Sequence, residues 1–179
     1  MSRADLLETE RLRLRRARSD DIPALMDLWS DPDVTRFMGG PRKAAELRVS
    51  FEEDVADSAS HRFDLWPVEE KATGEIVGHC GLIDKVVDGK AEIELVYVFA
   101  KRTWGQGYAT EITHALRDHA FGPMVLPRLI SLIEPENVAS ERVALKVGMS
   151  LEKEVVGPGG AIRRVHAMER EAERSAAAV

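Results

Sequence analysis

The sequence predicts a mixed α/β domain in which one mixed sheet carries helices on both faces. Three observations lead to this prediction. A β-branched apolar run at residues 93–99 leads through a glycine-bearing turn into a segment with helical spacing. Asp88-Gly89, just before that run, is a strong hairpin signal. Segments with strand and helix periodicity follow one another in the order β-α-α-β-β-β-α-β-α-β-β.

The N-terminal part is expected to hold one strand and two main helices. Residues 11–15 alternate between polar and apolar side chains, as a half-buried strand does. Residues 19–21 supply helix-cap chemistry, and Asp31-Pro32 resembles a further helix start. The apolar stripes of the two main helices are Ile22, Leu25, Met26 and Trp29, then Ala44, Leu47, Phe51 and Val55.

The middle of the chain has the pattern of a three-stranded meander followed by a crossover. The expected strands are residues 63–68, 75–83 and 91–99, with turns at 72–74 and 88–89. A helix with buried Ala109, Ile112, Leu116 and Ala120 then ends near Gly122-Pro123, before a short strand at 128–133. A strand, a helix and a second strand in this order form a crossover unit. Strands 91–99 and 128–133 are therefore expected to be parallel neighbours.

The C-terminal part is expected to form a capped helix and a final hairpin. Asn137 caps a helix that Gly148 ends. Residues 151–156 and 162–168 flank a glycine-rich turn, and residues from 169 to 179 form a frayed helix or a disordered tail. We expect one domain over residues 1–179, with a core at about 10–170.

Composition narrows the class of protein. The chain has 25 basic and 31 acidic residues, for a net charge of −6, which does not favour nucleic-acid binding. Its one cysteine allows no internal disulfide and no cysteine-rich zinc site. No apolar run approaches the ~20 residues of a membrane span, and the N-terminus lacks a hydrophobic signal region. A cytoplasmic protein without membrane or nucleic-acid partners is expected.

The turn at residues 104–107 is the most informative local feature. Gly105 and Gly107 lack Cβ atoms, so an anion can approach the backbone N–H groups where a helix begins. A phosphate-carrying cofactor is the first hypothesis. The segment lacks the third glycine of a dinucleotide fingerprint, and the chain contains no P-loop motif.

Together these motifs resemble the GNAT superfamily of N-acetyltransferases, and within it the branch of ribosomal-protein alanine acetyltransferases of the RimJ/RimL type. The resemblance covers roughly residues 10–170. It is carried by Thr9 to Arg15, Asp21-Ile22-Pro23, Thr73 to Gly78, Trp104-Gly105-Gln106-Gly107-Tyr108-Ala109-Thr110-Glu111, Asn137-Val138-Ala139-Ser140 and Lys146-Val147-Gly148-Met149.

The resemblance implies a GNAT-type fold with a twisted, mostly antiparallel sheet of about six to seven strands, in which one parallel pair splays apart. It also implies acetyl-CoA as cosubstrate and no metal. The pyrophosphate would lie on amides around Gly105 to Ala109, and the pantetheine arm would bond the backbone of strand 91–99. The implied cofactor-binding residues are Val98, Phe99, Trp104, Gly105, Gln106, Gly107, Tyr108, Ala109, Thr110, Asn137, Ser140 and Lys146.

The resemblance also suggests the catalytic groups. Glu94 lies where this branch often has a carboxylate, and it or a water could take the proton of the attacking amine. Glu92 shares its face, so the pair could instead be a solvated acidic stripe. Ser140 could protonate the leaving thiolate. Many members use a tyrosine on this helix, but this chain has only Tyr97 and Tyr108, which leaves serine or water.

The expected activity is transfer of an acetyl group from acetyl-CoA to a primary amine, by direct attack in a ternary complex. The acceptor is a small-molecule amine or a protein N-terminus, and the loop Met38-Gly39-Gly40-Pro41 is expected to shape its pocket. A catalytically silent CoA-binding sensor and the transfer of a different acyl group remain alternatives. A homodimer would suit many relatives.

Other reactive residue types receive structural interpretations. The five histidines are scattered, so a metal site is not expected. Cys80 is expected to be buried and structural, with His79 on the opposite strand face. Arg163 and Arg164 could edge the acceptor pocket, although solvent exposure is the simpler expectation. The arginines near the N-terminus are expected on one solvated strand face: Arg11, Arg13, Arg15, Arg16 and Arg18.

Overall fold

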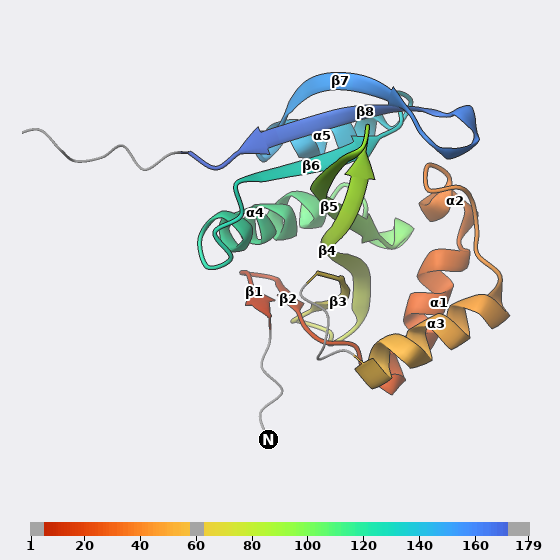
Figure 1. Ribbon diagram of the computed structural model, residues 1–179. Coiled ribbons are helices and arrows are strands. Elements are labelled where there is room, and N and C mark those ends of the chain that lie inside the picture. The colour runs from red at the N-terminus through yellow and green to blue at the C-terminus, as the bar shows by residue number, and fades with distance from the viewer. Residues whose placement is uncertain (1–5, 58–62, 172–179) are drawn as a thin grey trace, which may run out of the picture.

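A single sheet organises the molecule. The computed structural model describes residues 6–57 and 63–171, and the eight strands within these ranges follow the spatial order β1-β2-β3-β4-β5-β6-β8-β7 (Figure 1). All neighbouring strands are antiparallel except β5 and β6, which are parallel. The predicted mixed, mostly antiparallel sheet is therefore confirmed, with eight strands in place of six to seven.

The elements follow the predicted order. The strands are β1 (Leu7–Glu8), β2 (Leu12–Leu14), β3 (Leu65–Glu70), β4 (Ile76–Val87), β5 (Lys90–Phe99), β6 (Arg128–Ile133), β7 (Ser150–Val156) and β8 (Ile162–Glu169). The helices are α1 (Ile22–Ser30), α2 (Pro32–Thr35), α3 (Ala44–Asp57), α4 (Tyr108–Phe121) and α5 (Val138–Lys146).

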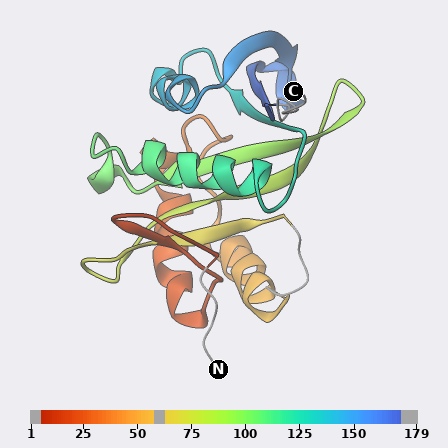
Figure 2. The ribbon, with the colours of Figure 1, turned by 90° about the vertical axis from the view of Figure 1, so that its left-hand side faces the viewer.

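Helices cover both faces of the sheet, as predicted. Leu95 and Phe99 of β5 pack in the cluster that contains Ile112 and Leu116 of α4, whereas Val98 packs in the cluster that contains the buried side chains of α1 and α3. Period-two alternation along β5 thus divides the core into two layers. The views agree that α4 lies across one face of β4 and β5, with α1 and α3 on the other (Figures 1 and 2).

The largest differences from prediction lie at strand ends. Strand β4 runs four residues past the expected end at Ile83 because the two-residue turn at Asp88-Gly89, where both residues have positive φ, pairs Val87 with Lys90. Strand β3 is shifted by two residues, and β1 was not predicted. Of the predicted tail, residue 169 ends β8, and residues 172–179 lie outside the described ranges, as do residues 1–5 and His61.

The prediction that the N-terminal arginines form one solvated face is wrong for Arg15. This side chain is buried and donates to both carboxylate oxygens of Asp21, at 2.7 and 2.8 Å, and to Glu69 at 2.7 Å. Arg13 reaches the other oxygen of Glu69 at 3.0 Å. The network ties β2 and β3 to the start of α1. The last residues of β3, Glu69 and Glu70, pair with Arg13 and Leu12 of β2.

Replacing Arg15 by methionine should leave the buried Asp21 without its ion-pair partner and Glu69 with Arg13 alone. We expect the free energy of unfolding to fall by about 3–5 kcal/mol, measured by urea denaturation. Arg48→Met, at a side chain 59% exposed with a 3.9 Å ion pair, is the matched control and should cost under about 1 kcal/mol. Equal losses in the two variants would contradict a structural role for this network.

Candidate functional site

The parallel pairing of β5 and β6 is interrupted after one bridge, between Glu94 and Ile130. A continuing ladder would join the Leu95 carbonyl to the Leu132 amide. Instead the Ser131 hydroxyl donates to the Leu95 carbonyl at 2.8 Å, and the Leu132 amide donates to the Glu94 carboxylate at 3.3 Å. The side chains of Ser131 and Glu94 thus replace the backbone partners that the next step of the ladder would supply. The strands separate beyond this point, as the resemblance implied.

The backbone of β5 presents donors to this gap. The Ala100 amide donates to the Val77 carbonyl, and the same register pairs Val98 with His79. Because hydrogen-bonded pairs recur at every second residue of an antiparallel ladder, the backbone of Val98 faces β4. The N–H groups of Tyr97 and Phe99 face the other way and have no partner strand in residues 6–57 and 63–171. The geometry therefore favours Tyr97 over Val98 as a donor to a ligand in the gap.

The turn after β5 brings bare amides to the start of α4. Gly105 and Gly107 have φ of 77° and 82°, and Gly107 is the N-cap of α4 without a side-chain cap. A Cβ on Gly105 would meet no atom within 4 Å. In the described part of the chain, no protein acceptor takes a hydrogen bond from the amides of residues 105–110. The amides of this segment, which includes Gln106, Tyr108, Ala109 and Thr110, can hold an anion at the positive end of the helix dipole.

The N-terminal segment braces this turn. The guanidinium of Arg11 forms an ion pair with Glu111 of α4 at 2.6 Å, donates to the Gln106 carbonyl at 2.9 Å and stacks 4.5 Å from the Tyr108 ring centre. The Tyr108 hydroxyl donates to Glu70 at the end of β3. The side chains of this corner therefore hold the loop from outside without filling the space beside Gly105.

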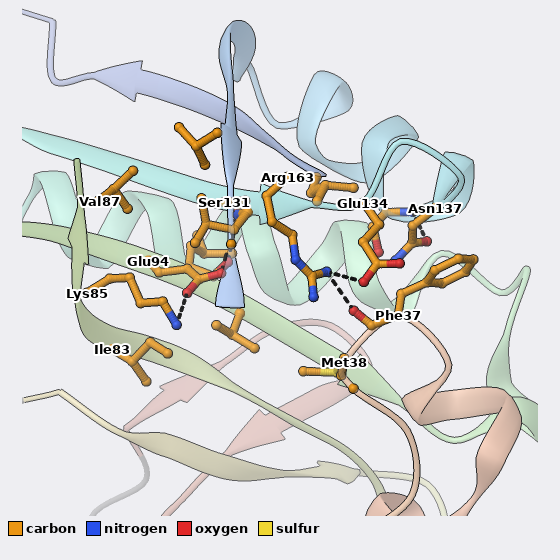
Figure 3. Close-up of a pocket in the computed structure, with 18 of the residues that line it drawn as sticks. Phe37, Met38, Ile83, Lys85, Val87, Glu94, Ser131, Glu134, Asn137 and Arg163 are labelled. Carbon is orange, nitrogen blue, oxygen red and sulfur yellow. Dashed lines mark hydrogen bonds and ion pairs between the residues drawn. The ribbon is translucent and has the colours of Figure 1, made fainter. Parts of the chain in front are cut away.

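A cavity of about 680 Å³ opens at the gap between the strands. Glu94, Tyr97, Asn137 and Ser140 all line it, together with the diverging ends of β5 and β6. The loop after α2 forms the opposite wall through Phe37, as Figure 3 shows. The predicted base, the predicted acid and the predicted loop thus meet in one cavity.

Glu94 is the buried acid of this cavity. Its side chain is 11% exposed, with Lys85 at 3.7 Å (Figure 3). Burial raises the pKa of the Glu94 carboxyl above its ordinary value, while Lys85 and the Leu132 amide partly oppose that rise. Glu92 lies on the same face but pairs with Arg128 at 3.1 Å and does not line the cavity. The two carboxylates therefore have different surroundings.

The start of α5 carries both its structural cap and the candidate acid. The Asn137 side chain accepts from the Ser140 amide at 3.2 Å, so its capping role is present. The Tyr97 hydroxyl donates to the Ser140 carbonyl at 2.7 Å, and burial raises the pKa of this phenol. Sequence reasoning missed this contact because it sought a tyrosine on the helix itself. The period of β5, which points Tyr97 toward α5, is the signal that could have found it.

The other predicted residues do not line this cavity: Val98, Phe99, residues 104–110 and Lys146. Trp104 is half exposed and donates its indole N–H to the Phe99 carbonyl at 2.8 Å, which occupies that carbonyl. Thr110 lies in the first turn of α4, and Lys146 is exposed in the last turn of α5. The structure thus places Trp104 and Thr110 beside the turn with unpaired amides and leaves Lys146 at the far end of its helix.

Arg163 connects two walls of the cavity. Its guanidinium donates to the Phe37 carbonyl at 2.9 Å and pairs with Glu134 at 2.6 Å (Figure 3). Solvent exposure was the simpler expectation for this residue, but its side chain is only 21% exposed. Arg42 holds the same loop by donating to the carbonyls of Met38 and Gly40. Two arginines therefore shape the loop that faces Glu94.

The structural interpretations of Cys80 and His79 are confirmed. Cys80 is fully buried, and burial raises the pKa of its thiol. His79 accepts from the Trp29 indole at 3.1 Å on the opposite face, and burial lowers its pKa to about 4. Within the described ranges no group of His, Cys, Asp and Glu side chains could hold a metal ion. None of the helices described there is long and apolar enough to cross a membrane.

Fold and site together define an α/β protein whose split parallel strands lie between a helix start with unpaired amides and a buried carboxylate. The profile of the family described as "Acetyltransferase (GNAT) domain" matches residues 11–150. The chain belongs to this family and is an acetyltransferase. The predicted placement in the RimJ/RimL branch stays a prediction.

Two bacterial relatives cover most of the chain. The "Uncharacterized protein YkkB" of Bacillus subtilis is 35% identical over 150 residues, which are 83% of this chain and 87% of the relative. The "Uncharacterized N-acetyltransferase p20" of Bacillus licheniformis is 32% identical over 157 residues, 84% of each chain.

Solved structures share the fold. A GNAT-family acetyltransferase from Bacillus anthracis has a TM-score of 0.78 at 26% identity, covering 93% of this chain and 99% of its own. A spermidine N-acetyltransferase from Vibrio cholerae, in complex with CoA and spermine, has a TM-score of 0.73 at 16% identity. This match covers 90% of this chain and 97% of the other. At that identity the second likeness shows the fold alone.

The raised pKa of Glu94 predicts how stability changes with pH. The folded state disfavours the ionised carboxyl, so the contribution of Glu94 to stability is present below its unfolded pKa and is lost as pH rises through the higher folded pKa. Glu94→Gln removes this loss. We expect the variant to gain stability relative to the natural protein as pH rises from about 4 to 7, measured by urea denaturation. Glu53→Gln, at an exposed side chain of α3, is the control substitution. A stability difference between Glu94→Gln and the natural protein that does not change with pH would refute the assignment.

Proposed function

We propose that the protein transfers the acetyl group of acetyl-CoA to a primary amine by direct attack in a ternary complex. One observation carries the proposal: the interrupted ladder between β5 and β6 has the uncapped start of α4 at one end and the buried Glu94 at the other. An extended thioester arm can add to β5 as a further strand would. The CoA complex of the spermidine N-acetyltransferase, which shares the fold, supports this choice of cosubstrate.

The residues fit acetyl-CoA from its phosphates to its thioester. Amides of Gly105 to Thr110 would hold the pyrophosphate, because they are unpaired and lie at the positive end of α4. The outward amides of Tyr97 and Phe99 would bond the pantetheine arm and the thioester oxygen, where charge develops during acyl transfer. Acetyl-CoA itself supplies the activated acyl group. The Val98 amide, which faces β4, would act only by holding this strand in register.

Glu94 is proposed as the base, directly or through one water. Its carboxylate would take one proton of the acceptor ammonium and pass it to solvent, and the free amine nitrogen would form the new C–N bond as the C–S bond breaks. The second proton that this nitrogen loses on becoming an amide would go to Glu94 or to water. The Ser140 hydroxyl would donate a proton to the departing thiolate and recover it from solvent. Tyr97 would fix the first turn of α5 through its bond to the Ser140 carbonyl. No covalent acetyl-enzyme is required, because the amine attacks the thioester itself.

Substitution of Glu94 tests this assignment. With a reactive amine, Glu94→Gln should lower kcat/KM by about 100-fold, while the KM for acetyl-CoA stays within about threefold. The natural enzyme should lose activity as pH falls through the raised pKa of Glu94, and the variant should lose that limb of the profile. Thiol release from acetyl-CoA measures both. Glu92→Gln, outside the cavity, is the control and should keep near-normal rates.

An unchanged rate in Glu94→Gln would assign proton removal to water alone. Intact-mass spectra during a single turnover should show no acetylated protein, and a transient acetyl adduct would refute direct attack. CoA binding without thiol release from any amine would favour the sensor alternative over catalysis.

The phosphate site has a separate test. Aspartate and asparagine are similar in size and both tolerate positive φ, so Gly105→Asp and Gly105→Asn differ mainly in charge. The aspartate should weaken CoA binding by about tenfold relative to the asparagine at low salt, measured by calorimetry. Equal affinities would place the pyrophosphate elsewhere. Absence of any heat with CoA at about 1 mM would refute acetyl-CoA as cosubstrate.

A further inference from the structure

The acceptor side of the cavity has an apolar wall that continues to the protein surface. Met38, Ile83 and Val87 surround the space in front of Glu94, as Figure 3 shows. Val86 and Val156 line the same cavity at its mouth and are 72% and 75% exposed. These are the two highest exposed fractions among the large apolar side chains of the described residues. The mouth therefore offers apolar surface that an apolar acceptor would cover.

The charges of the cavity are balanced and mostly paired. Its lining contains three cationic side chains, Arg42, Lys85 and Arg163, and three anionic ones, Asp88, Glu94 and Glu134. Glu134 is bound to Arg163 at 2.6 Å and Asp88 to Lys153 at 2.5 Å, whereas the contact of Glu94 with Lys85 is 3.7 Å.

This pairing limits how many cationic nitrogens the cavity can accept. Only Glu94 combines burial with a long ion pair, so it is the site for one ammonium group. A second ammonium of the same molecule would meet paired carboxylates and the three cations of the wall, which repel it. These side chains therefore do not form the acidic surface that a polyamine would need.

We propose that the acceptor is a monoamine carried on an apolar body, aromatic or branched aliphatic, rather than a polyamine or a small polar amine. The single amine nitrogen would lie at Glu94 while the body contacts Met38 and Ile83 and leaves the cavity past Val86 and Val156. The inference rests on the proposed acetyl transfer. An arylalkylamine and a peptide N-terminus with an apolar first side chain share this chemistry.

A panel of amines with acetyl-CoA tests the inference through thiol release. 2-Phenylethylamine should exceed ethanolamine, which has the same charge but no apolar body, by about 100-fold in kcat/KM, and should exceed spermidine by at least about tenfold. Tripeptides beginning with phenylalanine or with serine form the second arm. A higher kcat/KM for the phenylalanine peptide than for 2-phenylethylamine identifies a peptide N-terminus as the source, and the reverse identifies a small molecule.

Substitutions at the mouth test the same inference. Val86→Ser combined with Val156→Ser should raise the KM for 2-phenylethylamine by about threefold to tenfold and leave the KM for acetyl-CoA unchanged. Val49→Ser, at a side chain 56% exposed on α3 and outside the cavity, is the matched control and should change neither.

Two outcomes would overturn the inference and are distinguishable. A preference for spermidine or ethanolamine over 2-phenylethylamine and the phenylalanine peptide would refute the acceptor class and leave acetyl transfer intact. Release of no thiol with any of these amines would refute both.

Discussion

The interruption of one parallel ladder is the constraint on which the rest of the site depends. Strands β5 and β6 are joined by a single bridge because the Ser131 hydroxyl and the Glu94 carboxylate take the next backbone partners. These two side-chain bonds satisfy the Leu95 carbonyl and the Leu132 amide, which would otherwise be left unpaired at a free-energy cost, so the strands can separate at this point. The same glutamate that ends the ladder lines the resulting cavity, which couples the opening of the sheet to the position of the proposed base.

The second part of the site depends on contacts far apart in the sequence. Gly107 begins α4 without a side-chain cap, and Arg11 holds the preceding loop from outside through Glu111 and the Gln106 carbonyl. The loop is thus held by side chains from outside while its amides stay unpaired. Arg163 ties the loop after α2 to Glu134 through its bond to the Phe37 carbonyl and forms part of the cavity wall. The proposed cofactor region and the proposed acceptor region are thus held by separate ion pairs.

Most of the fold could be predicted from local patterns, for physical reasons. The β-branched apolar run at residues 93–99 predicts a strand, the asparagine at 137 and the glycine at 148 mark the ends of α5, and the Asp88-Gly89 pair predicts the hairpin turn. The parallel relation of β5 and β6 followed from the crossover rule. Burial of Arg15 could not be predicted, because its partners Asp21 and Glu69 come from other elements and its own strand pattern indicates an exposed side chain.

By itself, the sequence determined the order of the elements, the family resemblance and the glycine turn that can receive a phosphate, because these depend on neighbours within a few residues. Only the tertiary structure decided which backbone groups of β5 face the gap, that Tyr97 reaches Ser140 and that Arg163 lies in the cavity wall. The side of a strand on which each backbone group lies, and the ion pairs, both depend on residues from different elements. No local periodicity can specify them, and they are settled when the sheet and its helices pack together.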